Sequence, residues 1–179
     1  MLGGFIIRIL ICSFFVVIPL FLCFIIFRYK IMNKRKNVTN KLKEIIILLF
    51  AFYMIFLFQI TVLRIGFPIK TVGTYINFIP FLNYYKMYSV EKIGTFIYLF
   101  VGNIIWFVPF GFLLPYIMKK EPGFFKTTLF GFFVSLSIEI LQFVFHTGVS
   151  DIDDITLNVV GAMVGYYIYY IVKKHRKTL

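Results

Sequence analysis

Five long apolar runs restrict the fold of this sequence more than any other feature. Each run is long enough to cross about 30 Å of hydrocarbon as a helix, which takes roughly 18 to 25 residues. Glu139 is the single charged residue within them. The runs are Ile9–Phe27, Ile45–Leu63, Gly94–Met118, Thr127–Phe145 and Ile155–Val172. The sequence therefore predicts an all-α fold, a polytopic membrane helix bundle with about five transmembrane helices.

The composition agrees with a membrane protein and excludes a soluble globular one. Hydrophobic residues make up 61% of the chain and charged residues 15%, against roughly 45–50% and 25% in an ordinary soluble domain. The net charge of +12 raises nucleic acid as a partner, but a nucleic-acid-binding domain does not need 25 Phe and 12 Tyr. We therefore expect the lipid bilayer as partner and no nucleic acid.

The distribution of Lys and Arg predicts the orientation, because short cytoplasmic loops carry an excess of both. Residues 28–44 hold seven, residues 119–126 hold three, and the tail after Val172 holds four. The alternate loops hold four in a much longer stretch, and residues 146–154 hold none. This pattern predicts an N-terminus outside and a C-terminus inside.

One face of the fourth run is polar. Ser135, Glu139, Gln142 and His146 are spaced i, i+4, i+7 and i+11, which places them on one side of a helix. A carboxyl group near the centre of a membrane helix costs about 2.5–3.5 kcal/mol, so Glu139 should face the protein interior and have a partner. We take Glu139 and His146 as the candidate catalytic residues.

Further polar residues are expected near the outer ends of the neighbouring runs, where they would form an outward-facing polar cavity. Two alternatives stay open: amide and carboxyl groups between helices often only hold the helices together, and an Asp that precedes a helix often caps it. Gly161 and Gly165 form a small-xxx-small stripe that lets another helix approach closely. The predicted binding residues are Asn77, Asn103, Glu139, Gln142, Asp151, Asp153, Asp154 and Asn158.

No cofactor is expected. The alternative is a divalent cation, because carboxylates suit Ca²⁺ or Mg²⁺, and Asp151, Asp153 and Asp154 lie close together in the sequence. The remaining loop ligands of such a site are not evident in the sequence.

Two other segments carry structural expectations. Pro109 and Pro115 predict a kinked or broken helix in the third run, and broken helices line binding sites in transporters. The loop over residues 64–93 interleaves aromatic residues with Lys, which suits the headgroup layer. We expect a re-entrant or surface-lying segment there.

Three blocks of this chain resemble the VanZ-like membrane proteins, a family named after an accessory teicoplanin-resistance factor. The likeness spans roughly Tyr75 to Tyr166, and the first two runs match nothing beyond being apolar. The blocks are residues 77–81 (NFIPF), residues 102–111 (GNIIWFVPFG), and residues 139–142 (EILQ) with 151–161 (DIDDITLNVVG). The resemblance divides the chain into two N-terminal membrane helices with a basic cytoplasmic loop (1–63) and a VanZ-like domain (64–179). It implies a multi-pass protein of the bacterial cell membrane whose functional surface faces the cell wall.

Three functions remain open from the sequence. The first is a non-enzymatic envelope protein whose outer cavity binds a lipid-linked cell-wall precursor or a lipoglycopeptide, and which contributes to teicoplanin-type antibiotic resistance. The second is a membrane enzyme that acts on a lipid-linked cell-wall intermediate with Glu139 or His146 as acid or base. The third is a small transporter. The sequence does not fix the oligomeric state.

Overall fold

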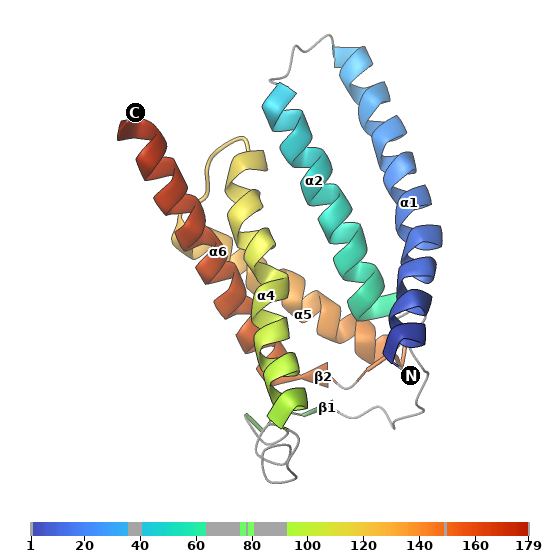
Figure 1. Ribbon diagram of the computed structural model, residues 1–179. Coiled ribbons are helices and arrows are strands. Elements are labelled where there is room, and N and C mark those ends of the chain that lie inside the picture. Colours follow the sequence, from blue (N-terminus) through green and yellow to red (C-terminus); the bar gives the residue numbers. More distant parts are fainter. Residues whose placement is uncertain are drawn as a thin grey trace. The chain divides into compact units, whose positions relative to one another are not determined.

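The protein is described from a computed structural model that covers residues 2–35, 41–63, 76–77, 79–80, 93–148 and 150–178. Among these residues, five helices are long and apolar enough to cross a membrane, which confirms the predicted all-α membrane bundle (Figure 1). The chain divides into two compact units, Met1–Val72 and Gly73–Leu179. We call them the N-terminal and the C-terminal unit.

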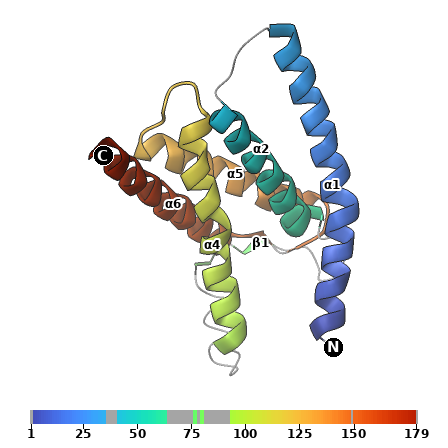
Figure 2. The ribbon, with the colours of Figure 1, turned by 45° about the horizontal axis from the view of Figure 1, so that its top comes forward.

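The N-terminal unit is a hairpin of two apolar helices (Figures 1 and 2). Helix α1 (Leu2–Arg35) lies beside α2 (Lys41–Phe58), which continues into the π-helical turn η1 (Gln59–Leu63). The rings of Phe21 and Phe52 meet edge to face at 5.2 Å between centroids. Near the loop, the guanidinium of Arg28 donates two hydrogen bonds to Glu44, of 3.0 and 2.8 Å. This paired geometry is the strong form of an Arg–carboxylate contact, and it links α1 to α2 near the loop.

The C-terminal unit holds three long helices and one short pair of strands. The helices are α4 (Ile93–Ile117), α5 (Phe124–Val144) and α6 (Ile152–Thr178). The strands are β1 (Ile76–Asn77) and β2 (Ser150–Asp151), which pair in parallel. Helix α6 packs most closely on α4 and also along α5 (Figures 1 and 2).

Small residues explain how closely α4 and α6 pack. A Cβ atom at Gly161 would collide with the carbonyl oxygen of Ile104, and one at Gly165 with the carbonyl oxygen of Val108. On the facing helix, a Cβ atom at Gly111 would collide with the carbonyl oxygen of Ala162. The close helix approach predicted from the glycine stripe is therefore confirmed, with α4 as the partner helix.

Bulky residues fill the space beside these glycines and also cover the outer faces of the helices. Phe107 and Phe110 of α4 are buried, and so is Leu157 of α6. The outward faces are apolar as well, and the side chain of Phe125 on α5 is 76% exposed. An apolar outer surface is what a bundle needs when lipid is its solvent.

The third run forms a continuous helix and not a broken one, and the kink expected at Pro109 and Pro115 stays a prediction. Helix α4 continues without interruption from Ile93 to Ile117, through Pro109 and Pro115. The interruption that would have supported a transporter-like site is therefore absent from α4. The expected interfacial segment over residues 64–93 lies outside the described residues, apart from Ile76, Asn77, Ile79, Pro80 and the start of α4.

Candidate functional site

A pair of two-residue strands brings together residues that lie far apart in the sequence. Ile76 lies opposite Ser150 and Asn77 opposite Asp151 in the parallel ladder. The side-chain amide of Asn77 donates to both carboxylate oxygens of Asp151, at 3.1 and 3.2 Å. Two predicted binding residues are thus in direct contact.

Asp151 also caps helix α6. One of its carboxylate oxygens accepts a hydrogen bond of 3.1 Å from the backbone N–H of Asp153, the second residue of the helix. An Asp before a helix satisfies one of the free N–H groups of the first turn in this way. The capping interpretation therefore holds for Asp151, whose two oxygens serve the helix and Asn77.

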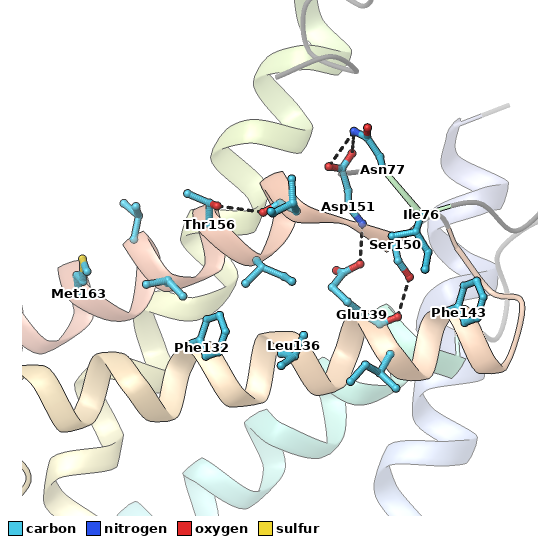
Figure 3. Close-up of a pocket in the computed structure, with 15 residues that line it drawn as sticks. Ile76, Asn77, Phe132, Leu136, Glu139, Phe143, Ser150, Asp151, Thr156 and Met163 are labelled. Atoms are coloured by element: carbon cyan, nitrogen blue, oxygen red, sulfur yellow. Dashed lines mark hydrogen bonds between the residues drawn. The ribbon is translucent and has the colours of Figure 1, made fainter. Parts of the chain in front are cut away.

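Glu139 is the buried carboxyl group that the sequence predicted, and its partner comes from β2. The residue is 4% exposed, and its Oε2 accepts a hydrogen bond of 3.0 Å from the backbone N–H of Asp151. The hydroxyl of Ser150 donates to the backbone carbonyl of Glu139 at 2.8 Å. Helix α5 and strand β2 are therefore joined at Glu139 by two hydrogen bonds (Figure 3).

Two further polar pairs connect the helices of this unit. Asn103 on α4 donates to Asp154 on α6 at 2.5 Å. Asn158, one turn further along α6, donates to the hydroxyl of Ser135 on α5 at 2.9 Å. Both pairs join side chains of neighbouring helices, as expected for polar groups that hold a membrane bundle together.

His146 does not belong to the polar face of α5, contrary to the prediction. The helix ends at Val144, and His146 follows it with a φ of 54°. Its N–H donates to the carbonyl of Phe143, and the N–H of Thr147 donates to that of Gln142. This is the hydrogen-bond pattern of a Schellman motif, so the helical spacing no longer applies at His146, which is exposed.

The remaining predicted residues lie at the edge of the site. Gln142 is half-buried in the last turn of α5. Asp153 is buried in the first turn of α6 beside Asp154, where negative side chains are favourable to the helix dipole. Among the described residues, no three His, Cys, Asp or Glu side chains are placed to hold a metal ion together. Asp151 and Asp154 instead bind Asn77 and Asn103, so the contacts give no support to a cation site.

A groove of about 730 Å³ runs between α5 and α6 and ends at the β1–β2 pair (Figure 3). Apolar side chains line most of it, and polar ones gather at the strand end. The apolar ones are Ile76, Phe132, Leu136, Ile140, Phe143, Ile152, Ile155, Val159, Val160 and Met163. The polar ones are Asn77, Glu139, Ser150, Asp151 and Thr156.

The groove differs from the predicted cavity in two respects. Its walls are apolar, and only one end is polar. Of the predicted residues, Asn77, Glu139 and Asp151 line it, whereas the others lie elsewhere. The sequence analysis missed the apolar wall on α5, although Phe132, Leu136, Ile140 and Phe143 recur at helical spacing beside Glu139.

Comparison with known proteins agrees with the resemblance in the sequence. The profile of the VanZ/LLP1 family matches residues 45–173. The chain is similar to Protein VanZ of Enterococcus faecium, with 33% identity over 134 residues that cover 71% of this chain and 74% of the relative. No solved structure matches the chain. The matched range begins in α2, so the expectation that the second run has no counterpart in the family is wrong.

Proposed function

This chain belongs to the VanZ/LLP1 family, and we propose that it acts at the cell envelope, where it lowers the action of teicoplanin-type glycopeptides. In this proposal the groove between α5 and α6 receives the acyl chain of a molecule anchored in the outer leaflet. The strand end of the groove then faces the cell wall.

The observation that carries the proposal is the combination of apolar walls with one polar end. A volume of about 730 Å³ lies within the roughly 300–1,000 Å³ range of small-molecule sites. In a bilayer, such a groove is surrounded by hydrocarbon, so an acyl chain can enter it from the side without crossing water. The polar end would then meet the first polar groups of the same molecule.

The distribution of charge supports an outward polar end. Residues 146–154, which contain β2, hold no Lys or Arg, whereas the turn at the other end of α5 holds three. By the positive-inside rule, the strand end lies on the outer side of the membrane. Acyl-tailed drugs such as teicoplanin anchor in the outer leaflet, on the same side as this end.

The proposal is tested by expressing the chain in a susceptible bacterium and measuring inhibitory concentrations of teicoplanin and of vancomycin, which lacks the acyl tail. Expression should raise tolerance to teicoplanin more than to vancomycin. Equal effects on both drugs would remove the argument from the acyl chain.

A groove-filling variant ties this effect to the site. Val160 lines the groove and is 37% exposed, whereas Val164, one helical turn further on, is 41% exposed and is not part of the lining. Val160→Trp should abolish the teicoplanin effect, and Val164→Trp at the same expression level should keep it. If both variants keep the effect, the groove is not the site.

Glu139 supports a second candidate, a membrane enzyme that acts on a lipid-linked cell-wall intermediate. Of the two candidate acid–base residues, Glu139 lines the groove and His146 does not. Glu139→Gln keeps the size of the side chain and an oxygen that can accept from Asp151, but it cannot transfer a proton. Full activity of this variant in a wall-precursor profile would end the catalytic candidate.

A further inference from the structure

At the polar end of the groove, the hydrogen-bond donors of the lining are already bonded to acceptors within the protein. The amide of Asn77 donates to Asp151, and the hydroxyl of Ser150 donates to the carbonyl of Glu139. The backbone N–H of Asp151 donates to Glu139. Further along the groove, the hydroxyl of Thr156 donates to the carbonyl of Ile152 at 3.0 Å. Each polar side chain of the lining that carries a donor therefore already has an acceptor.

One carboxyl oxygen of Glu139 has no hydrogen bond to the described residues. The Oε2 atom of Glu139 binds the N–H of Asp151, but Oε1 accepts no hydrogen bond from the described residues. The residue is 4% exposed and lines the groove, and Figure 3 shows its side chain directed toward the strand end. Because this oxygen is not hydrogen-bonded to the described residues and its residue lines the groove, a ligand that supplies a donor at this position gains a hydrogen bond.

The charges of the lining point in the same direction. Two carboxyl groups, of Glu139 and Asp151, lie at the polar end, and none of the described lining residues is Lys, Arg or His. A phosphate carries negative charge at neutral pH, so it would meet no cation among the described lining residues and would lie close to the carboxylate of Asp151.

We propose that the groove selects an acyl chain whose head group donates a hydrogen bond to Glu139, such as an ammonium or a hydroxyl group, and discriminates against a phosphate head. This inference rests on the proposed function, in which the groove binds an acyl chain. It gives the ligand a chemical class: a single-chain amphiphile with a donor head. It also separates the two candidate functions, because a cell-wall intermediate linked through a phosphate would be a poor ligand.

The test uses three photoreactive probes with the same hexadecyl chain, which carries a diazirine, and with an ammonium, a hydroxyl or a phosphate head. The full chain is reconstituted in phosphatidylcholine vesicles that contain each probe at the same low mole fraction. Mass spectrometry of peptides then locates the labelled residues. We expect labels on the walls of α5 and α6, with ammonium and hydroxyl probes exceeding the phosphate probe by roughly tenfold, the effect of one hydrogen bond to a carboxyl group.

The variant Glu139→Gln tests whether the carboxyl group of Glu139 causes the head-group preference. The amide oxygen still accepts from the N–H of Asp151, and an NH₂ donor takes the place of Oε1, so the preference for donor heads should shrink and phosphate labelling should rise. Asp154→Asn is the matched control. It replaces a carboxyl group outside the groove, which acts on Glu139 only through its charge, and it keeps an oxygen for Asn103. Its head-group preference should therefore change much less than that of Glu139→Gln.

The outcomes are distinct. If no probe labels the groove walls, the acyl-chain function itself is overturned. If the walls are labelled but the phosphate probe labels the wild type as well as the others do, only the head-group selection is overturned. The same conclusion follows if Glu139→Gln and Asp154→Asn shift the preference equally, because the effect would then be one of general charge. The wild-type comparison decides the matter even if a variant fails to fold.

Discussion

Replacing Gly165 by Ala should destabilise the protein more than such a small change usually does. The new Cβ atom would collide with the carbonyl oxygen of Val108, and it would lie 2.8 Å from the backbone nitrogen of Phe112 and 3.0 Å from the Cα of Gly111. All three neighbours are backbone atoms of α4, so no side chain can rotate away. The helices must move apart, and each small shift weakens contacts along the whole α4–α6 interface.

The expected size of the effect follows from two opposing terms. Overpacking a well-packed interface costs typically 1–3 kcal/mol, and the upper value applies here because the obstacle is backbone. Replacing Gly by Ala within a helix gains about 0.5–1 kcal/mol. The net loss is therefore about 2 kcal/mol, which is roughly a thirtyfold change in the unfolding equilibrium.

Gly102 supplies the matched control on α4. A Cβ atom there meets no described atom within 4 Å, so Gly102→Ala should keep only the gain in helix propensity and stabilise the protein by up to about 1 kcal/mol. The same chemical change thus has opposite signs at the two positions. Reversible unfolding by dodecyl sulfate in mixed micelles would measure both variants, with the single tryptophan, Trp106 on α4, as fluorescent reporter.

A double variant extends this measurement, because Gly111 and Gly165 face each other across the interface. Once one substitution has pushed the helices apart, the second should cost less, so the two losses should not add. A Gly165→Ala variant as stable as the wild type, or a Gly102→Ala variant equally destabilised, would refute the argument from close packing.

Three further predictions concern the polar contacts and the orientation. Asp151→Ala removes the cap of α6, worth about 1 kcal/mol, and leaves the Asn77 amide buried without an acceptor, which costs about 1–3 kcal/mol. In the same unfolding assay, Asp151→Asn should lose less than half as much free energy of unfolding. Tyr169 donates a 2.6 Å hydrogen bond to Glu121 in the turn between α4 and α5, so Tyr169→Phe should lose about 1.5–3 kcal/mol, and a loss below 0.5 kcal/mol would contradict this reading. In a variant without Cys12 and Cys23, a cysteine at His146 should react with an impermeant maleimide added to intact cells, and one at Lys119 should not. The Lys and Arg distribution predicts that these positions lie on opposite sides of the membrane, and the reverse pattern would contradict this orientation.

The helices could be predicted from the sequence because membrane spans depend on a local property, the length of an apolar run. Their ends were less predictable, since polar contacts decide them. Helix α6 begins at Ile152 and not at Ile155, because Asp151 supplies the cap. It also continues to Thr178 through the basic tail, where Lys and Arg suit the C-terminal end of a helix.

The site was predictable only as far as helical periodicity applies. Periodicity correctly placed Ser135 and Glu139 on one face of α5, but it was extended past the end of the helix to His146. A left-handed His at the helix end has no clear signal in the sequence, because Gly is the usual residue there. The β1–β2 pair was also missed, since two residues per strand are too few for an alternating pattern and the partners lie 74 positions apart.

The sequence left two interpretations of the polar groups open, packing contacts and a binding site, and the contacts separate the residues to which each could apply. The amides of Asn103 and Asn158 donate to Asp154 and Ser135, and none of these four side chains lines the groove. They join helices, which is the structural role. Glu139 lines the apolar groove, and one of its carboxyl oxygens accepts from the N–H of Asp151 while the other accepts no hydrogen bond from the described residues. In a membrane, an acceptor left open beside hydrocarbon is costly unless a ligand completes it, so Glu139 is where a functional role is to be sought.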